Sequence, residues 1–266
     1  MIRSIVLEVV LLGAGLAPQL AQADAGPPYF TNDPGTPGDG NWEINLGSMP
    51  TVATHAASYQ LPQIDLNFGV GDRIQLTYEI PYVLQTTNGA PRETGWSNAY
   101  PGLKWRFLDQ GEDGWQVSTF PQLETNASLR ERQDGIAAPG PRLLVPVEIA
   151  RRVGPVDIDF EAGYYAFMHQ PRERILGLVI GGSPSPRFEV DVEAYNDHVM
   201  GTPAGNTTID VGGRYKFSPA FIALFMAGHT IGATSTGEQA FTGYIGIQIL
   251  LTNYGRRLAA AGADEH

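Results

Sequence analysis

The sequence predicts an all-β protein, a single antiparallel, up-and-down transmembrane β-barrel of about 12 strands. Three observations favour it: an export-type N-terminus, short segments in which polar and apolar residues alternate, and connections that are alternately short and long. With 32 Gly and 20 Pro in 266 residues, the chain favours many short strands joined by turns over long helices. One fold accounts for the whole length.

The first residues have the features of a signal peptide. Arg3 precedes an apolar stretch over residues 5–16, and Ala21-Gln22-Ala23 is the small-x-small pattern that signal peptidase accepts. We therefore expect a signal peptide at residues 1–23, with Ala23-Asp24-Ala25 as a second cleavage pattern and a membrane anchor as the alternative. Export of this kind predicts a location in the bacterial outer membrane.

The residues after the signal peptide differ in composition from the rest of the chain. Residues 24–40 contain Pro27-Pro28 and Pro34-Gly35 and are too rich in Pro, Gly and Asp to form a strand, so we expect an extended N-terminal arm. The barrel is predicted over residues 41–254. Residues 255–266, which are rich in Ala and acidic residues, are expected to form a flexible C-terminal tail.

Between residues 41 and 253, about twelve segments of about ten residues show period-2 alternation. In residues 73–80 and 187–194, for example, odd-numbered residues are polar and even-numbered residues are apolar. Side chains two apart on a strand point the same way, so each segment has one polar and one apolar face. Such strands suit either a membrane barrel or a soluble sandwich.

The connections favour the barrel. The joints predicted after even-numbered strands are short: Gly71-Asp72, residues 111–114, Gly154-Pro155, residues 183–186 and Ser218-Pro219. The joints predicted after odd-numbered strands are longer: residues 49–58, 86–95, 126–141, 169–172, 198–206 and 232–239. Alternation of this kind is typical of a barrel whose two rims face different compartments.

Aromatic residues gather near the predicted strand ends, where a membrane barrel carries its interfacial girdles. Ordinary core and turn positions are the alternative for this set: Trp42, Tyr82, Trp105, Phe107, Trp115, Tyr215, Phe217, Phe221 and Phe241.

In a barrel the polar rows face the lumen. We expect charged lumen-lining residues of both signs, which neutralise one another across the bore: Arg73, Glu79, Lys104, Arg106, Glu124, Asp157, Asp159, Glu161, Arg187, Glu189, Asp191, Glu193, Asp210 and Arg214. The acidic rows at residues 157–161 and 189–193 also have the oxygen ligands of a divalent cation site. Salt-bridged lining is the favoured interpretation.

Two strands place apolar residues on the predicted inner face. The lumen-lining set therefore also includes Leu176, Leu224 and Met226, together with Leu178, Ile180 and Ile222. An apolar stripe of this kind would favour a partly apolar solute over a simple ion. The alternative is a register bulge, or contact with the arm folded into the barrel.

Several function classes are disfavoured. The formal net charge of −11 opposes binding to nucleic acid, and the absence of Cys removes thiolate metal sites and Cys nucleophiles. A lipid-hydrolysing barrel would need His and Ser close together at the lipid face. His169, His198 and His229 leave that alternative open, although no Ser lies in a G-x-S-x-G setting. No cofactor is implied.

Several short motifs resemble the bacterial family named for a MetA-pathway of phenol degradation. They are residues 26–34 (GPPYFTNDP), 40–43 (GNWE), 71–76 (GDRIQL), 80–82 (IPY), 102–107 (GLKWRF) and 120–125 (FPQLET). The resemblance spans essentially the whole chain after residue 23. It implies an outer-membrane barrel associated with transport of small organic, often aromatic, compounds.

The sequence therefore predicts a porin-like channel for passive passage of small organic molecules, with outer-membrane lipid and the solute as its partners. The alternatives are a soluble periplasmic β-sandwich that binds a ligand, the barrel hydrolase, and a structural or adhesive barrel.

Overall fold

The computed structural model describes residues 26–111, 114–138, 140–167, 172–203, 205–231 and 239–252. The predicted signal peptide and C-terminal tail lie outside these ranges. The described elements are β1(Trp42–Val52), β2(Ala56–Val70), β3(Ile74–Thr87), β4(Glu93–Trp96), β5(Tyr100–Asp109), β6(Trp115–Thr119), β7(Gln122–Glu124), α1(Leu129–Gln133), β8(Arg142–Val153), β9(Val156–Phe167), β10(Glu173–Ser185), β11(Phe188–Val199), β12(Gly205–Ser218), β13(Phe221–Ile231) and β14(Phe241–Leu251).

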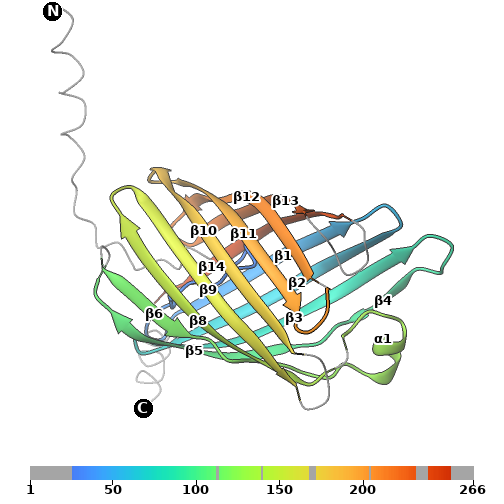
Figure 1. Ribbon diagram of the computed structural model, residues 1–266. Coiled ribbons are helices and arrows are strands. Elements are labelled where there is room, and N and C mark those ends of the chain that lie inside the picture. The colour runs from blue at the N-terminus through green and yellow to red at the C-terminus, as the bar shows by residue number, and fades with distance from the viewer. Residues whose placement is uncertain are drawn as a thin grey trace, which may run out of the picture.

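The strands form one antiparallel sheet that closes on itself (Figure 1). β1 pairs with β2 on one side and with β14 on the other, so the first and last strands of the chain are neighbours. β4 and β5 both pair with β3, and β6 and β7 both pair with β8, so each couple is one interrupted strand. Counting each couple once, the described residues form the predicted 12-stranded up-and-down barrel. The sandwich alternative is therefore wrong.

The two rims of the barrel differ in their connections. The short-turn rim has the tight joints at residues 71–73, 154–155, 186–187 and 219–220, and the long-loop rim has residues 88–92 and the α1 segment between β7 and β8. Gly71 and Gly154 have φ of 62° and 63°, a conformation that other residues rarely adopt in such turns. No helix within the described ranges is long and apolar enough to span a bilayer.

One predicted long joint is wrong. Residues 49–58 were expected to be a loop, but β1 continues to Val52 and β2 begins at Ala56, with Thr51 paired to Ser58. Pro50 and the small residues of this segment resemble loop composition, yet they are held in the ladder by their neighbours. Residues 232–238 and most of 169–172 lie outside the described ranges, so the joints predicted there stay predictions.

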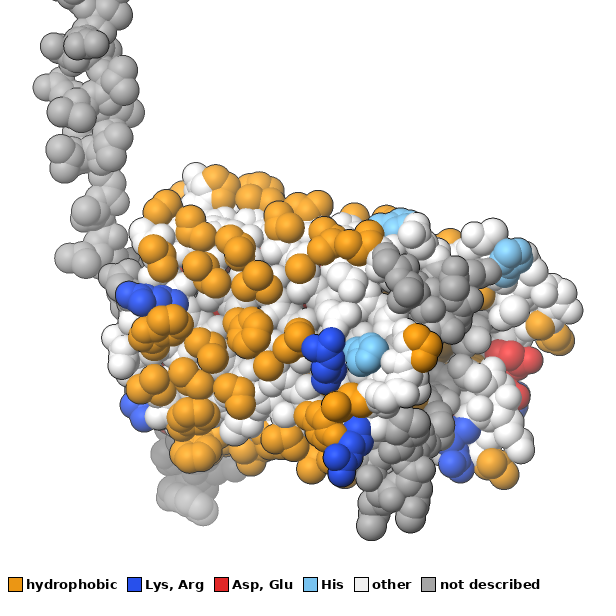
Figure 2. Space-filling view, in the orientation of Figure 1, with side chains coloured by type: hydrophobic (Ala, Val, Ile, Leu, Met, Phe, Trp, Pro, Cys, Tyr) orange, Lys and Arg blue, Asp and Glu red, His pale blue; other side chains and the backbone are white. Residues whose placement is uncertain are grey.

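The outer wall of the barrel is apolar (Figure 2). Large hydrophobic side chains point away from the interior in many strands and stay exposed, Ile245 most of all at 68%. They include Leu76, Tyr78, Leu103, Val145, Val147, Val192, Val211 and Ile245. A continuous apolar wall of this size is typical of a surface covered by lipid or by another protein.

Aromatic residues mark both ends of this wall, as predicted. At the short-turn rim, the rings of Trp105 and Phe107 lie 5.6 Å apart and those of Tyr215 and Phe217 lie 5.1 Å apart. Towards the long-loop rim, the rings of Tyr82 and Trp96 lie 5.2 Å apart. Rings at this level suit the interfaces of a bilayer.

Candidate functional site in the barrel lumen

The N-terminal arm, residues 26–40, lies inside the barrel. Thr31 is fully buried, as are Pro28 and Pro34, and Tyr29 is nearly so. Where the arm joins β1, the Gly40 N–H donates to the Gly69 carbonyl oxygen and the Gly69 N–H donates to the Asn41 carbonyl oxygen, both at 3.0 Å. Gly69 lies at the end of β2 next to the short-turn rim. The arm therefore fills the half of the lumen adjoining that rim.

Carboxylates of the barrel wall hold the backbone of the arm. The N–H groups of Phe30 and Thr31 donate to the two carboxylate oxygens of Glu193 at 3.0 and 2.6 Å, and the N–H of Asn32 donates to Glu161 at 2.9 Å. A chain that crosses a lumen outside any sheet has unpaired backbone N–H groups, which need acceptors. Two rows predicted as lumen lining supply them.

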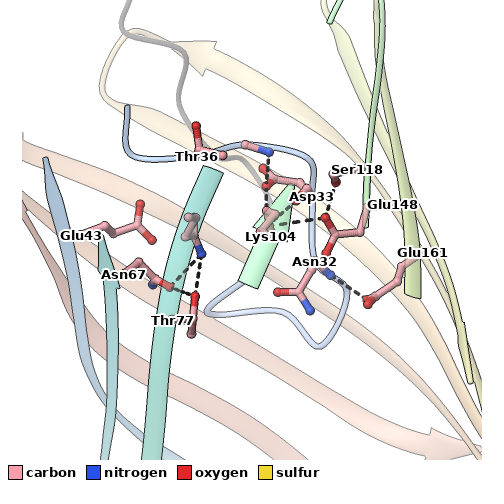
Figure 3. Close-up of polar contacts among 12 residues, drawn as sticks. Asn32, Asp33, Thr36, Glu43, Asn67, Thr77, Lys104, Ser118, Glu148 and Glu161 are labelled. Carbon is pink, nitrogen blue, oxygen red and sulfur yellow. Dashed lines mark hydrogen bonds and ion pairs between the residues drawn. The ribbon is translucent and has the colours of Figure 1, made fainter. Parts of the chain in front are cut away.

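A lysine secures the middle of the arm (Figure 3). The Lys104 ammonium donates to the carbonyl oxygen of Asp33 and lies 3.6 Å from its Oδ1. The same ammonium lies 3.7 Å from Glu148, which also accepts a hydrogen bond from Ser118. All four side chains are buried, so the two carboxylates offset the cost of burying the cation.

Tyr29 forms the next contact. Its hydroxyl donates to Asp191 at 3.0 Å. Burial, followed by the negative charge of Asp191, raises the pKa of Tyr29, so the phenol stays protonated and remains a donor. Arg214 lies beside it, 3.2 Å from Glu189 and 3.3 Å from the carbonyl oxygen of Pro27. This end of the arm is therefore bound through one phenol and one guanidinium.

Glycines on the inner wall make room for the arm. A Cβ at Gly177 of β10 would lie 2.1 Å from Thr31 Oγ1, and one at Gly212 of β12 would lie 2.9 Å from the Tyr29 ring. Both distances are too short for an added carbon, so the close approach of the arm depends on the missing side chains.

Apolar residues complete the arm's binding surface. Tyr29 packs in one buried cluster with Val179, Ile222, Leu224, Met226 and Tyr244. Leu224 has no exposed surface, because the arm covers it. The interpretation of Leu224 and Met226 as a stripe for an apolar solute is therefore wrong, and the alternative of contact with the folded-in arm is correct.

Leu176 was placed on the wrong face. In β10 the buried, inward positions are Ile175, Gly177 and Val179, whereas Leu178 and Ile180 are exposed on the outer wall, and Leu176 shares their face. Both faces of this strand are apolar, so alternation carries no information about which one is inside.

Two arginines of the predicted lining are also misplaced. Arg73 and Arg187 are exposed in the turns before β3 and β11, so they lie at the short-turn rim. The polar alternation continues into these residues, but the strands begin after them. The other charged members of the set lie on inward rows of β3, β5, β7, β9, β11 and β12: Glu79, Lys104, Arg106, Glu124, Asp157, Asp159, Glu161, Glu189, Asp191, Glu193, Asp210 and Arg214.

Ion pairs link several of these rows. Arg152 lies 2.6 Å from Asp157, and Arg142 contacts both Glu124 and Glu173, the latter at 2.8 Å. In the described part of the chain no group of three or more His, Cys, Asp or Glu is arranged to hold a metal ion. In the two acidic rows, Asp157 and Glu189 contact arginines, and Glu161, Asp191 and Glu193 contact the arm.

The histidines considered for a hydrolase do not converge. His198 lies near the end of β11 and His229 near the end of β13. β12 lies between these strands, and the two histidines pair with its residues Gly205 and Ile209. His169 lies outside the described residues.

Beyond the arm, towards the long-loop rim, a vestibule of about 440 Å³ opens in the lumen. It is lined by Phe30, Thr51, Ala53, Ala56, Ala57, Ser58, Gln85, Tyr195, Asp197, Asn206, Thr208, Thr230, Ala240 and Thr242. Its floor includes the stacked rings of Phe30 and Tyr195, whose centroids lie 5.3 Å apart. The sequence reasoning missed this site because it assigned several of these small residues to loops. The available signal was that residues 49–58 can continue the two flanking strands and pair with each other.

Comparison with known proteins shows the fold. No family model matches the chain, and no curated protein does. Among solved structures, it is similar to an outer membrane channel from Pseudomonas putida F1, with a TM-score of 0.64 and 12% identity over 86% of this chain and 100% of that one.

Two other barrels are less similar. The KdgM porin has a TM-score of 0.53 at 8% identity, covering 77% of this chain and 98% of that one. The translocator domain of the autotransporter NalP from Neisseria meningitidis has 0.53 at 9%, covering 79% and 88%. The architecture is therefore that of outer-membrane β-barrels.

Proposed function

We propose that the protein is an outer-membrane channel for passive passage of small organic molecules. The observation that carries the proposal is that the closed sheet has exposed apolar residues on its outer face and rows of acidic and basic residues on its inner face. Lipid offers no hydrogen-bond partner to an unpaired backbone group, and a closed sheet has no edge strand that exposes such groups. In this orientation the short-turn rim faces the periplasm and the long-loop rim faces outside.

The lumen has an entry and a restriction. Solute enters the vestibule from the long-loop rim, and the arm narrows the route to the periplasm. Because the arm is bound by hydrogen bonds, one lysine and one apolar cluster rather than by the sheet ladder, it can be displaced without opening the barrel. Diffusion down a gradient supplies the driving force, and no cofactor is involved.

The solute is proposed to be small and organic, and aromatic compounds are favoured. A vestibule of about 440 Å³ lies within the usual size range of small-molecule sites, and two of its lining residues carry stacked aromatic rings. The short motifs that resemble the phenol-degradation family also favour an aromatic solute, and the similarity of fold to a Pseudomonas putida outer membrane channel supports the barrel on which the proposal rests. The chain is proposed to have no enzymatic activity.

Reconstitution tests the proposal. Purified protein in planar bilayers is expected to give discrete conductance steps, and in cells it is expected in the detergent-extracted outer-membrane fraction with heat-modifiable gel mobility. Release by osmotic shock would contradict the membrane location. Membrane location without conductance for ions or small solutes would favour a structural or adhesive barrel, and lipid hydrolysis would favour the enzyme.

A further inference from the structure

Among the described residues that line it, the vestibule has one carboxylate and no basic side chain. Of its lining residues, Asp197 alone has an ionisable acidic or basic side chain, apart from the phenol of Tyr195, and the others are small, amide, hydroxyl or aromatic. A carboxylate in such a lining repels anions and attracts cations, and the described lining residues offer no positive group to reverse its field.

Asp197 faces the interior from β11, where it pairs with Ile175 of β10 and Asn206 of β12. Its carboxylate accepts a hydrogen bond from the Asn206 side-chain amide at 2.9 Å, and the backbone N–H of Asn206 and the His198 side chain also lie close to it. A carboxylate held by a neutral amide is fixed in position and still has oxygen lone pairs for a further donor.

One basic residue of the inner wall, Arg142 at the start of β8, is already engaged. Arg142 lies between Glu124 and Glu173, contacting both carboxylates, and its guanidinium stacks 4.1 Å from the centre of the Tyr165 ring. This group of one arginine and two carboxylates has a net negative charge. It therefore adds to the field of Asp197 instead of cancelling it.

The aromatic floor lies on the same inner rows. Tyr195 is two residues from Asp197 on β11, so both side chains point inward, and Phe30 stacks on Tyr195 from the arm. Ring faces attract cations and stack with aromatic solutes. A carboxylate close to such faces matches a solute in which a short linker joins an ammonium group to an aromatic ring.

We propose that the vestibule binds small aromatic ammonium compounds, prefers them to neutral aromatic alcohols, and excludes aromatic carboxylates. This inference deepens the proposed channel function by naming its preferred solute class. The ring stacks at the floor, and the ammonium group donates to Asp197.

Binding is measured on the purified full chain in detergent, by calorimetry at neutral pH, so that the result does not depend on conductance. Benzylammonium, benzyl alcohol and benzoate are probes of similar size that differ in charge. The expected order of affinity is benzylammonium, then benzyl alcohol, then benzoate. Asp197→Asn should weaken benzylammonium binding about threefold to tenfold and change benzyl alcohol binding by less than about twofold.

Asp134→Asn is the matched control. It removes the same charge from the α1 segment on the long-loop rim, where Asp134 pairs with Arg130 away from the vestibule lining. Its binding constants should equal those of the unmodified protein. Heat-modifiable mobility checks that both variants fold.

The two proposals fail separately. Benzoate binding as tight as benzylammonium binding, no benzylammonium binding at all, or an Asp197→Asn variant that keeps full affinity, would overturn the solute class and leave the channel intact. Binding in the expected order by a protein without conductance would keep the site and overturn the channel.

Discussion

The two halves of the lumen differ in what their side chains contact. Next to the short-turn rim, Glu161, Glu193 and Lys104 are buried and bind the arm. In the vestibule, the wall consists of threonines, alanines and amides with one carboxylate, and it borders open space. Charge is thus concentrated where it binds protein and is sparse where solute enters. Rows of ionised residues in a barrel are therefore not by themselves a selectivity filter.

The largest expected effect comes from removing the arm. Deletion of residues 26–40 should raise single-channel conductance several-fold, because the half of the lumen that the arm fills becomes an aqueous bore. Planar-bilayer recordings measure it. Unchanged conductance with a correctly folded barrel would mean that the arm does not limit passage.

Leu224→Asp tests the apolar part of the arm's binding surface. An unpaired carboxylate buried against Tyr29 should weaken docking of the arm by about 3–5 kcal/mol and open the channel for most of the time. Open probability in the same recordings is the measurement. Leu224→Met, which conserves volume, should keep the open probability of the unmodified protein. An Asp variant with that same open probability would show that the apolar cluster does not control opening.

Gly177→Val is expected to have a smaller effect of the same sign. The added carbons collide with Thr31, and overpacking of this kind costs about 1–3 kcal/mol, so the arm should leave its position more often. The substitution adds volume inside the lumen, yet it should increase conductance because the displaced arm no longer blocks the bore. Ala194→Val adds carbons on the outer wall and should leave conductance unchanged. A decrease for Gly177→Val would contradict the account.

Glu193→Gln should give the smallest change. The amide can accept one of the two arm N–H groups that the carboxylate now holds, so docking should weaken by about 1–2 kcal/mol. Brief openings should become more frequent, whereas Glu93→Gln in β4 should behave as the unmodified protein. Longer closures for Glu193→Gln would show that this carboxylate does not hold the arm.

Sequence patterning predicted the barrel because the information is local. In β11, charged Glu189, Asp191 and Glu193 alternate with Val190 and Val192, and the register that buries the acidic row is then determined. In β10 the same rule failed, since Ile175 and Val179 face the arm while Leu176 faces outward. In the sequence, an inner face that binds the apolar part of the arm has the same apolar composition as an outer face that contacts lipid.

The position of the arm could not be predicted from the sequence. The carboxylates that accept hydrogen bonds from its backbone are 129 to 163 residues away along the chain, and the donors are N–H groups, which any residue other than proline possesses. The vestibule was missed for a related reason. Small residues such as Ser58 and Ala57 have no distinctive pattern, and only their pairing in β2 places them on a wall.

The central claim is that the arm shields one half of the lumen while the vestibule is open to the outside. The chain has no Cys, so single cysteines report unambiguously on access. Ser58→Cys lies in the vestibule wall and Ser118→Cys lies fully buried in the arm-filled half. With a membrane-impermeant maleimide added outside intact cells, Ser58→Cys should label quickly, and Ser118→Cys should label only after deletion of residues 26–40. Equal labelling of both positions in the full-length protein would contradict the account.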